Sequence, residues 1–165
     1  MHGSGPHLTS LERAEALCQK RGVQLTPLRR EVLRLVLEAE SPIGAYALLD
    51  QLKESRARAA PPTVYRALDF LLEQGLIHRL ERLNAFMGCV EALEGHDHHH
   101  DHAHDHPHQF LICRGCGTTR EISDYAVAEA IAAAAVRGGF SAARATVEIE
   151  GLCAQCGEAA APNGA

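Results

Sequence analysis

Apolar residues recur at helical spacing in four segments of the first half of the chain and then give way to an alternating pattern. In the fourth segment Val64, Leu68, Leu71 and Leu72 form one apolar stripe, which leaves Arg66 on the opposite face. A capping box (Thr9 with Glu12) and N-terminal prolines mark helix starts. The four predicted helices begin at Thr9, Thr26-Pro27, Ala45 and Pro61-Pro62.

Residues 77–82 and 85–90 alternate as two strands would, and Leu83-Asn84 fits a two-residue turn because Asn tolerates a positive φ. Helices followed by a hairpin are typical of a winged helix-turn-helix, in which the last helix before the hairpin enters the major groove of DNA. Thr63, Tyr65 and Arg66 lie at the start of that helix. Periodicity alone favours the alternative, in which Arg66 is a solvated surface charge.

Two C-x2-C pairs, Cys113/Cys116 and Cys153/Cys156, are separated by 36 residues. Four thiolates at such spacing suit tetrahedral zinc. A redox pair would call for a βαβ context, which the pattern lacks. Strands over residues 109–112, 118–122 and 146–150 and an Ala-rich helix over residues 124–136 indicate a small α/β unit around the cysteines.

A second metal site follows from the predicted hairpin. A two-residue turn at Leu83-Asn84 would set His78 directly opposite Cys89, with Cβ atoms roughly 4.5–5.5 Å apart. An imidazole and a thiolate at that separation can share one metal ion. The alternative is a partly buried histidine beside a core cysteine, and the geometry alone does not choose between them.

Eight of the 11 histidines fall between His96 and His108. Most of this run, His96 to His104, has the composition of a disordered loop that binds metal weakly. His106 and His108 adjoin the strand that leads to the first cysteine pair, so we expect a metal ligand from one of these two and not from the preceding run.

Charge and composition restrict the class of protein. The chain is 46% hydrophobic but has no apolar run long enough to span a bilayer and no signal-peptide pattern at its start, so we expect a cytoplasmic protein with reduced cysteines. Its net charge of −5 is unevenly distributed along the chain. Residues 1–88 carry 12 Lys and Arg against 10 Asp and Glu, a net of +2, whereas residues 89–165 carry 4 against 11, a net of −7. The two halves are therefore expected to have different partners.

The combination of these features resembles the Fur family of bacterial metal-responsive repressors, most closely its zinc-uptake-regulator branch. The resemblance covers roughly residues 9–157. The residues that carry it are Leu25-Thr26-Pro27-Leu28-Arg29, residues 61–71 (PPTVYRALDFL), Gly75-Leu76-Ile77-His78, residues 108–117 (HQFLICRGCG) and residues 151–156 (GLCAQC).

The resemblance implies an α+β fold with three parts. These are a winged-helix DNA-binding domain over residues 1–84, a hinge and His-rich loop over residues 85–108, and an α/β dimerisation and zinc-binding domain over residues 109–165. One structural and one regulatory Zn²⁺ per protomer are expected. The structural ligands would be Cys113, Cys116, Cys153 and Cys156. The regulatory ligands would be His78, Cys89, Glu121 and either His106 or His108. The DNA-contacting residues would be Thr26, Arg29, Thr63, Tyr65 and Arg66.

The implied function is repression of zinc-uptake genes by a zinc-loaded homodimer on palindromic, double-stranded operator DNA, with no membrane and no small organic substrate as partner. Two alternatives stay open: a Fur-type repressor that senses another divalent metal, and a cytosolic zinc buffer or chaperone that uses the His-rich loop. A zinc hydrolase is not expected, because no H-E-x-x-H or similar motif is present.

Overall fold

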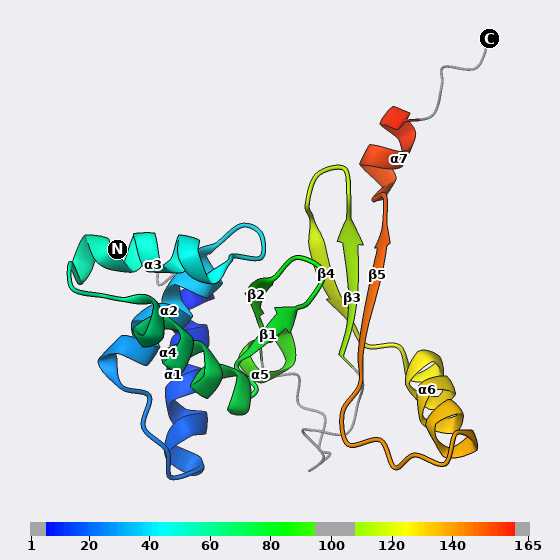
Figure 1. The fold of residues 1–165 in the computed structure, drawn as a ribbon, viewed down its shortest axis with the longest axis horizontal. Coiled ribbons are helices and arrows are strands. Elements are labelled where there is room, and N and C mark those ends of the chain that lie inside the picture. Colours follow the sequence, from blue (N-terminus) through cyan, green and yellow to red (C-terminus); the bar gives the residue numbers. More distant parts are fainter. Residues whose placement is uncertain (1–5, 95–107, 161–165) are drawn as a thin grey trace. The chain divides into compact units, whose positions relative to one another are not determined.

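The computed structural model describes residues 6–94 and 108–160. They belong to two compact units, whose boundary lies between Asp97 and His98. The first unit contains four helices, a hairpin and a short helix, and the second contains a three-stranded sheet and two helices (Figure 1). Within the described ranges, no helix is both long and apolar enough to cross a membrane.

Four helices build the core of the first unit: α1 (Pro6–Lys20), α2 (Pro27–Glu38), α3 (Ala45–Ser55) and α4 (Pro61–Glu73). The predicted start of α2 is confirmed, since the Thr26 side chain accepts a hydrogen bond from the Arg29 N–H. The predicted start of α1 is wrong, because the helix already begins at Pro6 and includes Thr9. Their apolar stripes meet in one core, whose fully buried leucines include Leu11, Leu33, Leu48, Leu52, Leu68 and Leu71.

A hairpin follows α4 and completes a winged helix. It consists of β1 (Ile77–Leu80) and β2 (Ala85–Gly88), and an antiparallel bridge joins Ile43 to Phe86 of β2. Both strands are shorter than predicted, and the turn spans four residues, 81–84, because Leu80 pairs with Ala85. Asn84 has a φ of +47°, as its role in the turn requires. The chain then forms α5 (Val90–Glu94), where a strand end was expected.

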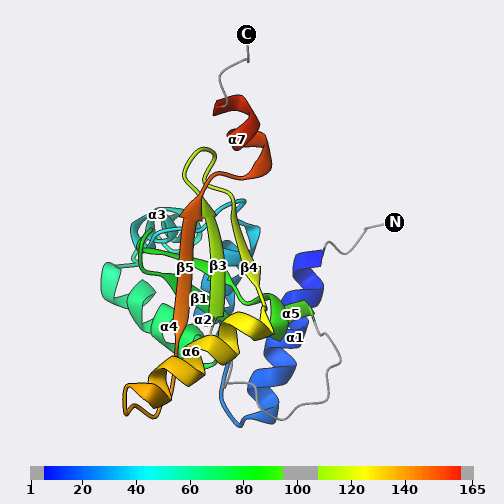
Figure 2. The same cartoon turned by 90° about the vertical axis from the view of Figure 1, so that its right-hand side faces the viewer.

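The second unit has strand order β4-β3-β5, with β3 (His108–Cys113) in the centre. β4 (Thr119–Ile122) runs antiparallel to β3, and β5 (Thr146–Gly151) runs parallel to it. The parallel crossover passes through α6 (Tyr125–Arg137), which crosses the sheet in Figure 2 and has Asp124 as its N-cap. A short helix, α7 (Ala154–Ala160), follows β5 and was not predicted. The mixed helix and sheet content agrees with the expected α+β class.

Candidate metal centres and nucleic-acid interface

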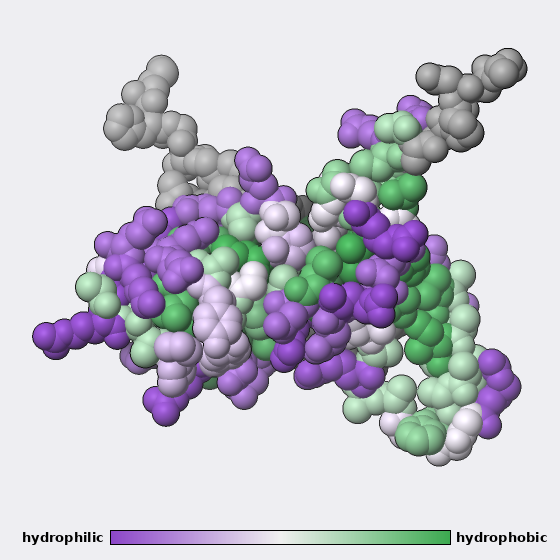
Figure 3. Space-filling model, turned by 45° about the horizontal axis from the view of Figure 1, so that its top comes forward, coloured by the Kyte–Doolittle hydropathy of each residue, from purple (hydrophilic) through white to green (hydrophobic). Residues whose placement is uncertain are grey.

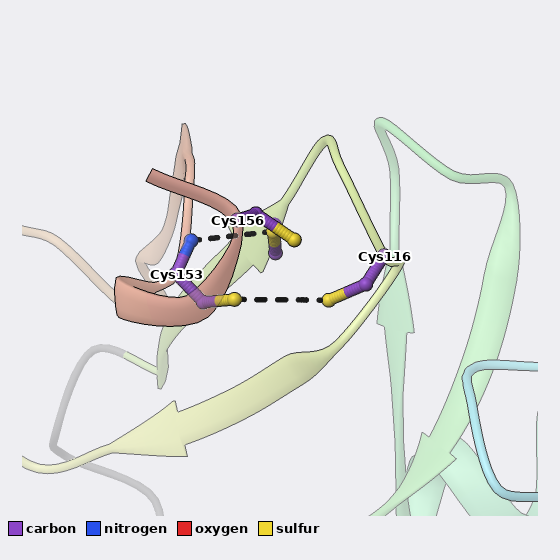
Figure 4. A group of neighbouring side chains, drawn as sticks. Cys116, Cys153 and Cys156 are labelled. Carbon is purple, nitrogen blue, oxygen red and sulfur yellow. Dashed lines mark hydrogen bonds between the residues drawn. The ribbon is translucent and has the colours of Figure 1, made fainter. Parts of the chain in front are cut away.

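The two cysteine pairs lie at one end of the second unit's sheet. Cys113 ends β3 and is aligned with Gly151, the last residue of the parallel strand β5, so both C-x2-C segments leave the sheet at the same edge. The four Sγ atoms lie within 4.8 Å of one another, and those of Cys116 and Cys153 are 3.8 Å apart (Figure 4). A tetrahedral zinc with Zn–S bonds of about 2.3 Å separates its sulfurs by about 3.8 Å. The cluster therefore fits zinc.

Backbone N–H groups stabilise the thiolate form of one of these cysteines, Cys113. The N–H of Cys153 donates to Sγ of Cys113, and together with the N–H groups of Cys116 and Gly115 it lowers the pKa of the Cys113 thiol to about 6. Cys156 behaves oppositely, because hydrogen bonding to the neighbouring cysteine sulfurs raises its pKa to about 12. Four adjacent sulfurs cannot all be ionised without a cation among them.

Gly115 leaves the space that this arrangement needs. A Cβ at this position would lie 2.8 Å from Sγ and 2.9 Å from Cβ of Cys156, which is closer than carbon atoms approach in folded proteins. Neither contacting atom can retreat without moving a thiol of the cluster. This requirement was not predicted, although the glycine inside the first C-x2-C pair is a signal for it in the sequence.

His78 and Cys89 are buried in the first unit, 7% and 4% exposed. The register expected from a two-residue turn is wrong, because His78 pairs with Met87 and the Cys89 N–H donates to the carbonyl of Leu76. Cys89 is therefore the diagonal neighbour of His78 rather than its direct partner, and both side chains keep the same face of the hairpin. A ring nitrogen of His78 and Sγ of Cys89 still lie within 4.8 Å, a separation that one metal ion can bridge.

A second diagonal pair of metal-binding side chains lies within the second unit. Glu121 on β4 is aligned with Phe110 of β3, two residues after His108. Nδ1 of His108 lies 3.7 Å from a carboxylate oxygen of Glu121. His106 and the run His96–His104 lie outside the described residues. Each unit thus presents one histidine together with one acidic or thiol ligand.

The outer face of α4 bears the residues expected to contact DNA. Val64, Leu68 and Leu71 are buried, whereas Tyr65 is 43% exposed and Arg66 is exposed. Within residues 6–94 and 108–160, Arg66 makes no hydrogen bond or ion pair. Thr63 is half-buried in the first turn. The acidic residues of α4, Asp69 and Glu73, come after Arg66, so the positive N-terminal end of the helix faces no carboxylate of its own.

Thr26 and Arg29, the other two expected DNA contacts, have partners within the first unit. Thr26 caps α2. The guanidinium of Arg29 donates to the carbonyl of Gln24 over 2.8 Å and lies over the ring of Phe70, 3.7 Å from its centroid. The sequence pattern did not reveal this contact, because Arg29 and Phe70 are on different helices.

A winged-helix unit followed by a small sheet with clustered thiols is the architecture of a metal-responsive regulator of transcription. The ferric uptake regulator family matches residues 20–150, and the chain belongs to this family. The relatives described below are named as regulators, in agreement with the expectation that the chain is not an enzyme.

Two curated relatives share most of their length with this chain. The zinc uptake regulation protein of Escherichia coli (strain K12) is 42% identical over 148 residues, which cover 90% of this chain and 81% of that protein. The zinc uptake regulation protein of Mycobacterium tuberculosis is 31% identical over 138 residues, which cover 82% of this chain and 95% of that protein.

Two solved structures of similar proteins also match this chain over most of its length. A zinc uptake regulator complexed with zinc and DNA matches with a TM-score of 0.80 and 41% identity, over 90% of this chain and 93% of that one. The crystal structure of holo XcZur matches with a TM-score of 0.75 and 42% identity, over 90% of this chain and 96% of that one.

Proposed function

We propose that the chain is a zinc-responsive transcriptional repressor, which binds palindromic operator DNA as a zinc-loaded homodimer and represses zinc-uptake genes. One observation carries the proposal: a buried imidazole–thiol pair is formed by His78 on β1 and Cys89 directly after β2, in the hairpin region that follows α4. A metal bound there acts on the segment next to the residues that would read DNA. The chromosomal target would place the protein in the cytoplasm.

Two zinc ions per protomer are part of this proposal. Cys113, Cys116, Cys153 and Cys156 would hold a structural ion, which stabilises a unit too small to bury a large core of its own. The regulatory ion would take His78 and Cys89 from the first unit. From the second unit it would take Glu121 and a histidine, His108 or His106. The 3.7 Å separation of His108 from Glu121 supports His108.

Zinc would act by coupling the two units. When the regulatory ion takes ligands from both, the angle between the winged helix and the dimerisation unit is fixed, and the two α4 helices of a dimer can stand about one DNA turn apart. Without zinc, the angle varies and its fixation costs entropy. A coupling free energy of about 3 kcal/mol would tighten DNA binding about 150-fold.

Exposed apolar residues of the second unit support pairing with a second copy. Leu111 of β3 and Ile149 of β5 are aligned neighbours, 39% and 45% exposed. Val136 and Phe140, at and after the end of α6, are 73% and 75% exposed. Apolar side chains gather over this unit in Figure 3. A surface of this kind typically marks a protein interface.

The proposal is tested by operator binding at buffered free zinc. We expect the chain to bind a palindromic duplex more tightly as zinc rises, with a steep dependence on salt because phosphate contacts release counterions. Arg66→Ala should weaken binding about 10- to 100-fold and relax sequence preference. Lys20→Ala removes the same charge from the end of α1 and should leave binding unchanged. DNA affinity that is independent of zinc would refute the regulatory role.

Two other functions make different predictions. A sensor of another metal would bind DNA more tightly with Fe(II), Ni(II) or Co(II) than with zinc, whereas a thiolate at Cys89 favours zinc over Fe(II). A zinc buffer would depend on the His96–His104 run, which lies outside the described residues. Deletion of residues 96–104 should abolish buffering but leave zinc-dependent DNA binding intact.

A further inference from the structure

The geometry points to Arg29 as a positioning residue, which sets how α4 lies against α2, and not as a contact to DNA phosphate. This inference rests on the proposed function, since it concerns how the DNA-reading helix is held. It replaces the DNA contact that the resemblance implies for Arg29.

Arg29 joins three segments of the first unit. It lies in the first turn of α2, its Nη1 donates to the carbonyl of Gln24 over 2.8 Å, and its guanidinium carbon is 3.7 Å from the ring centroid of Phe70 on α4. Phe70 is only 8% exposed and belongs to the core, so its ring is itself fixed. The Arg29 side chain is half-buried, and its guanidinium interacts with groups of the same unit, the carbonyl of Gln24 and the ring of Phe70.

The contact requires the chemistry of arginine. A guanidinium is planar, so it can stack on a ring while its N–H groups donate in the plane. A lysine ammonium can approach a ring or a carbonyl but cannot hold both in one fixed geometry. Arg29→Lys therefore keeps the charge that a phosphate contact needs and removes the fixed contact.

Rotation of α4 would reach the proposed DNA contacts directly. Phe70 lies four residues after Arg66, which is about one helical turn. Side chains that read bases must be held within roughly 10–20° of their productive orientation. Loss of the contact at Phe70 would therefore misplace Tyr65 and Arg66 and reduce discrimination between sequences, while the number of phosphate contacts stays the same.

The experiment compares zinc-loaded, full-length variants on a palindromic operator and on a scrambled duplex over a range of salt concentrations. We expect Arg29→Lys and Phe70→Leu each to lower the ratio of specific to non-specific affinity about tenfold, with an unchanged salt slope. Zinc content should also be unchanged. Arg30→Lys is the matched control, because Arg30 pairs with Glu15 at 3.8 Å instead, and its ratio should stay that of the unmodified chain.

Several results would overturn the inference. If Arg29→Lys behaves like the unmodified chain, or if Arg29→Ala weakens both duplexes equally and lowers the salt slope by about 1, then Arg29 is a phosphate contact. If Arg29→Lys fails to fold, the comparison of Phe70→Tyr with Phe70→Leu replaces it, because only the tyrosine variant retains an aromatic ring. If the two variants have the same ratio of specific to non-specific DNA affinity, the inference is wrong. An unmodified chain that does not distinguish the duplexes with zinc contradicts the proposed function itself.

Discussion

The backbone N–H of Cys153 donates a hydrogen bond to Sγ of Cys113 over 3.2 Å, although the two residues are 40 positions apart. The parallel pairing of β3 with β5 makes this contact possible, because it brings the ends of the two strands to one edge of the sheet. This hydrogen bond stabilises the thiolate form of Cys113, which is the form that binds a metal ion.

Zinc binding at this cluster should depend on pH. At about pH 7.5 the Cys156 thiol, with its pKa raised to about 12, is protonated and must release its proton when zinc binds. As the pH falls through about 6, Cys113 becomes protonated as well, so zinc affinity should fall. We expect a chromogenic chelator to remove zinc faster at acid than at neutral pH. Zinc release at a constant rate over this range would show that protonation of these thiols does not control zinc binding.

Gly115→Ala should weaken the same site. Its new Cβ would come within 3 Å of Cys156, so one thiol must move away from the cluster. We expect zinc affinity to fall about tenfold or more, the size of effect that displaced supporting groups have at metal sites. Gly157→Ala is the control, because a Cβ there meets no atom within 4 Å. Competition with a chelator of known affinity measures both, and equal affinities would show that Gly115 has no such role.

Glu31 connects α2 to the end of α3, and its removal should destabilise the first unit. Its carboxylate accepts hydrogen bonds from Ser55 and, over 2.7 Å, from Arg56, and these bonds lower the pKa of Glu31 below 4.5. A lowered folded-state pKa stabilises the fold above the unfolded value and ceases to do so as the pH falls through the folded value.

We therefore expect Glu31→Gln to reduce the free energy of unfolding by about 0.5–1 kcal/mol at neutral pH, with a difference that shrinks below about pH 4.5. Glu38→Gln removes one member of the exposed Arg34–Glu38 pair and should change stability less. Urea denaturation at several pH values measures this. A difference that grows on acidification would have the wrong sign.

Ile149→Glu should separate the proposed dimer. A carboxylate on this exposed apolar strand would be buried without a partner in a paired interface, which is costly. Leu83→Glu is the control, because Leu83 is similarly exposed, at 41%, but lies in the turn of the first unit's hairpin. Sedimentation velocity should show a monomer for the first variant and a dimer for the second. A dimer in both would place the interface elsewhere.

Local chemistry explains which elements could be predicted. Thr26-Pro27 and Asp124 mark helix starts through bonds to residues three positions on, so their sequence signal is strong. Asn84 likewise adopts the positive φ expected of it. The start of α1 was misplaced because the capping box at Thr9 is a local pattern that the preceding residues override by continuing the helix to Pro6.

Contacts between distant segments explain what could not be predicted. The pairing of His78 with Met87 depends on a four-residue turn, and a difference of two residues in turn length shifts every pair of the hairpin. Because the register differs by two residues, His78 and Cys89 stay on the same face of the hairpin. The two side chains therefore lie close together as predicted, although the predicted register is wrong. The stacking of Arg29 on Phe70 has no local signal at all.

In the function we propose, one regulatory zinc, bound by Cys89, controls DNA binding, and a second zinc is structural. The most direct measurement is zinc per protomer together with operator affinity for Cys89→Ser, at free zinc that saturates the unmodified chain. We predict that this variant keeps the structural zinc and the dimer, loses one zinc per protomer and no longer binds DNA more tightly when zinc is added. If the variant retains its full zinc content and its zinc-dependent affinity, Cys89 is not a ligand of a regulatory zinc.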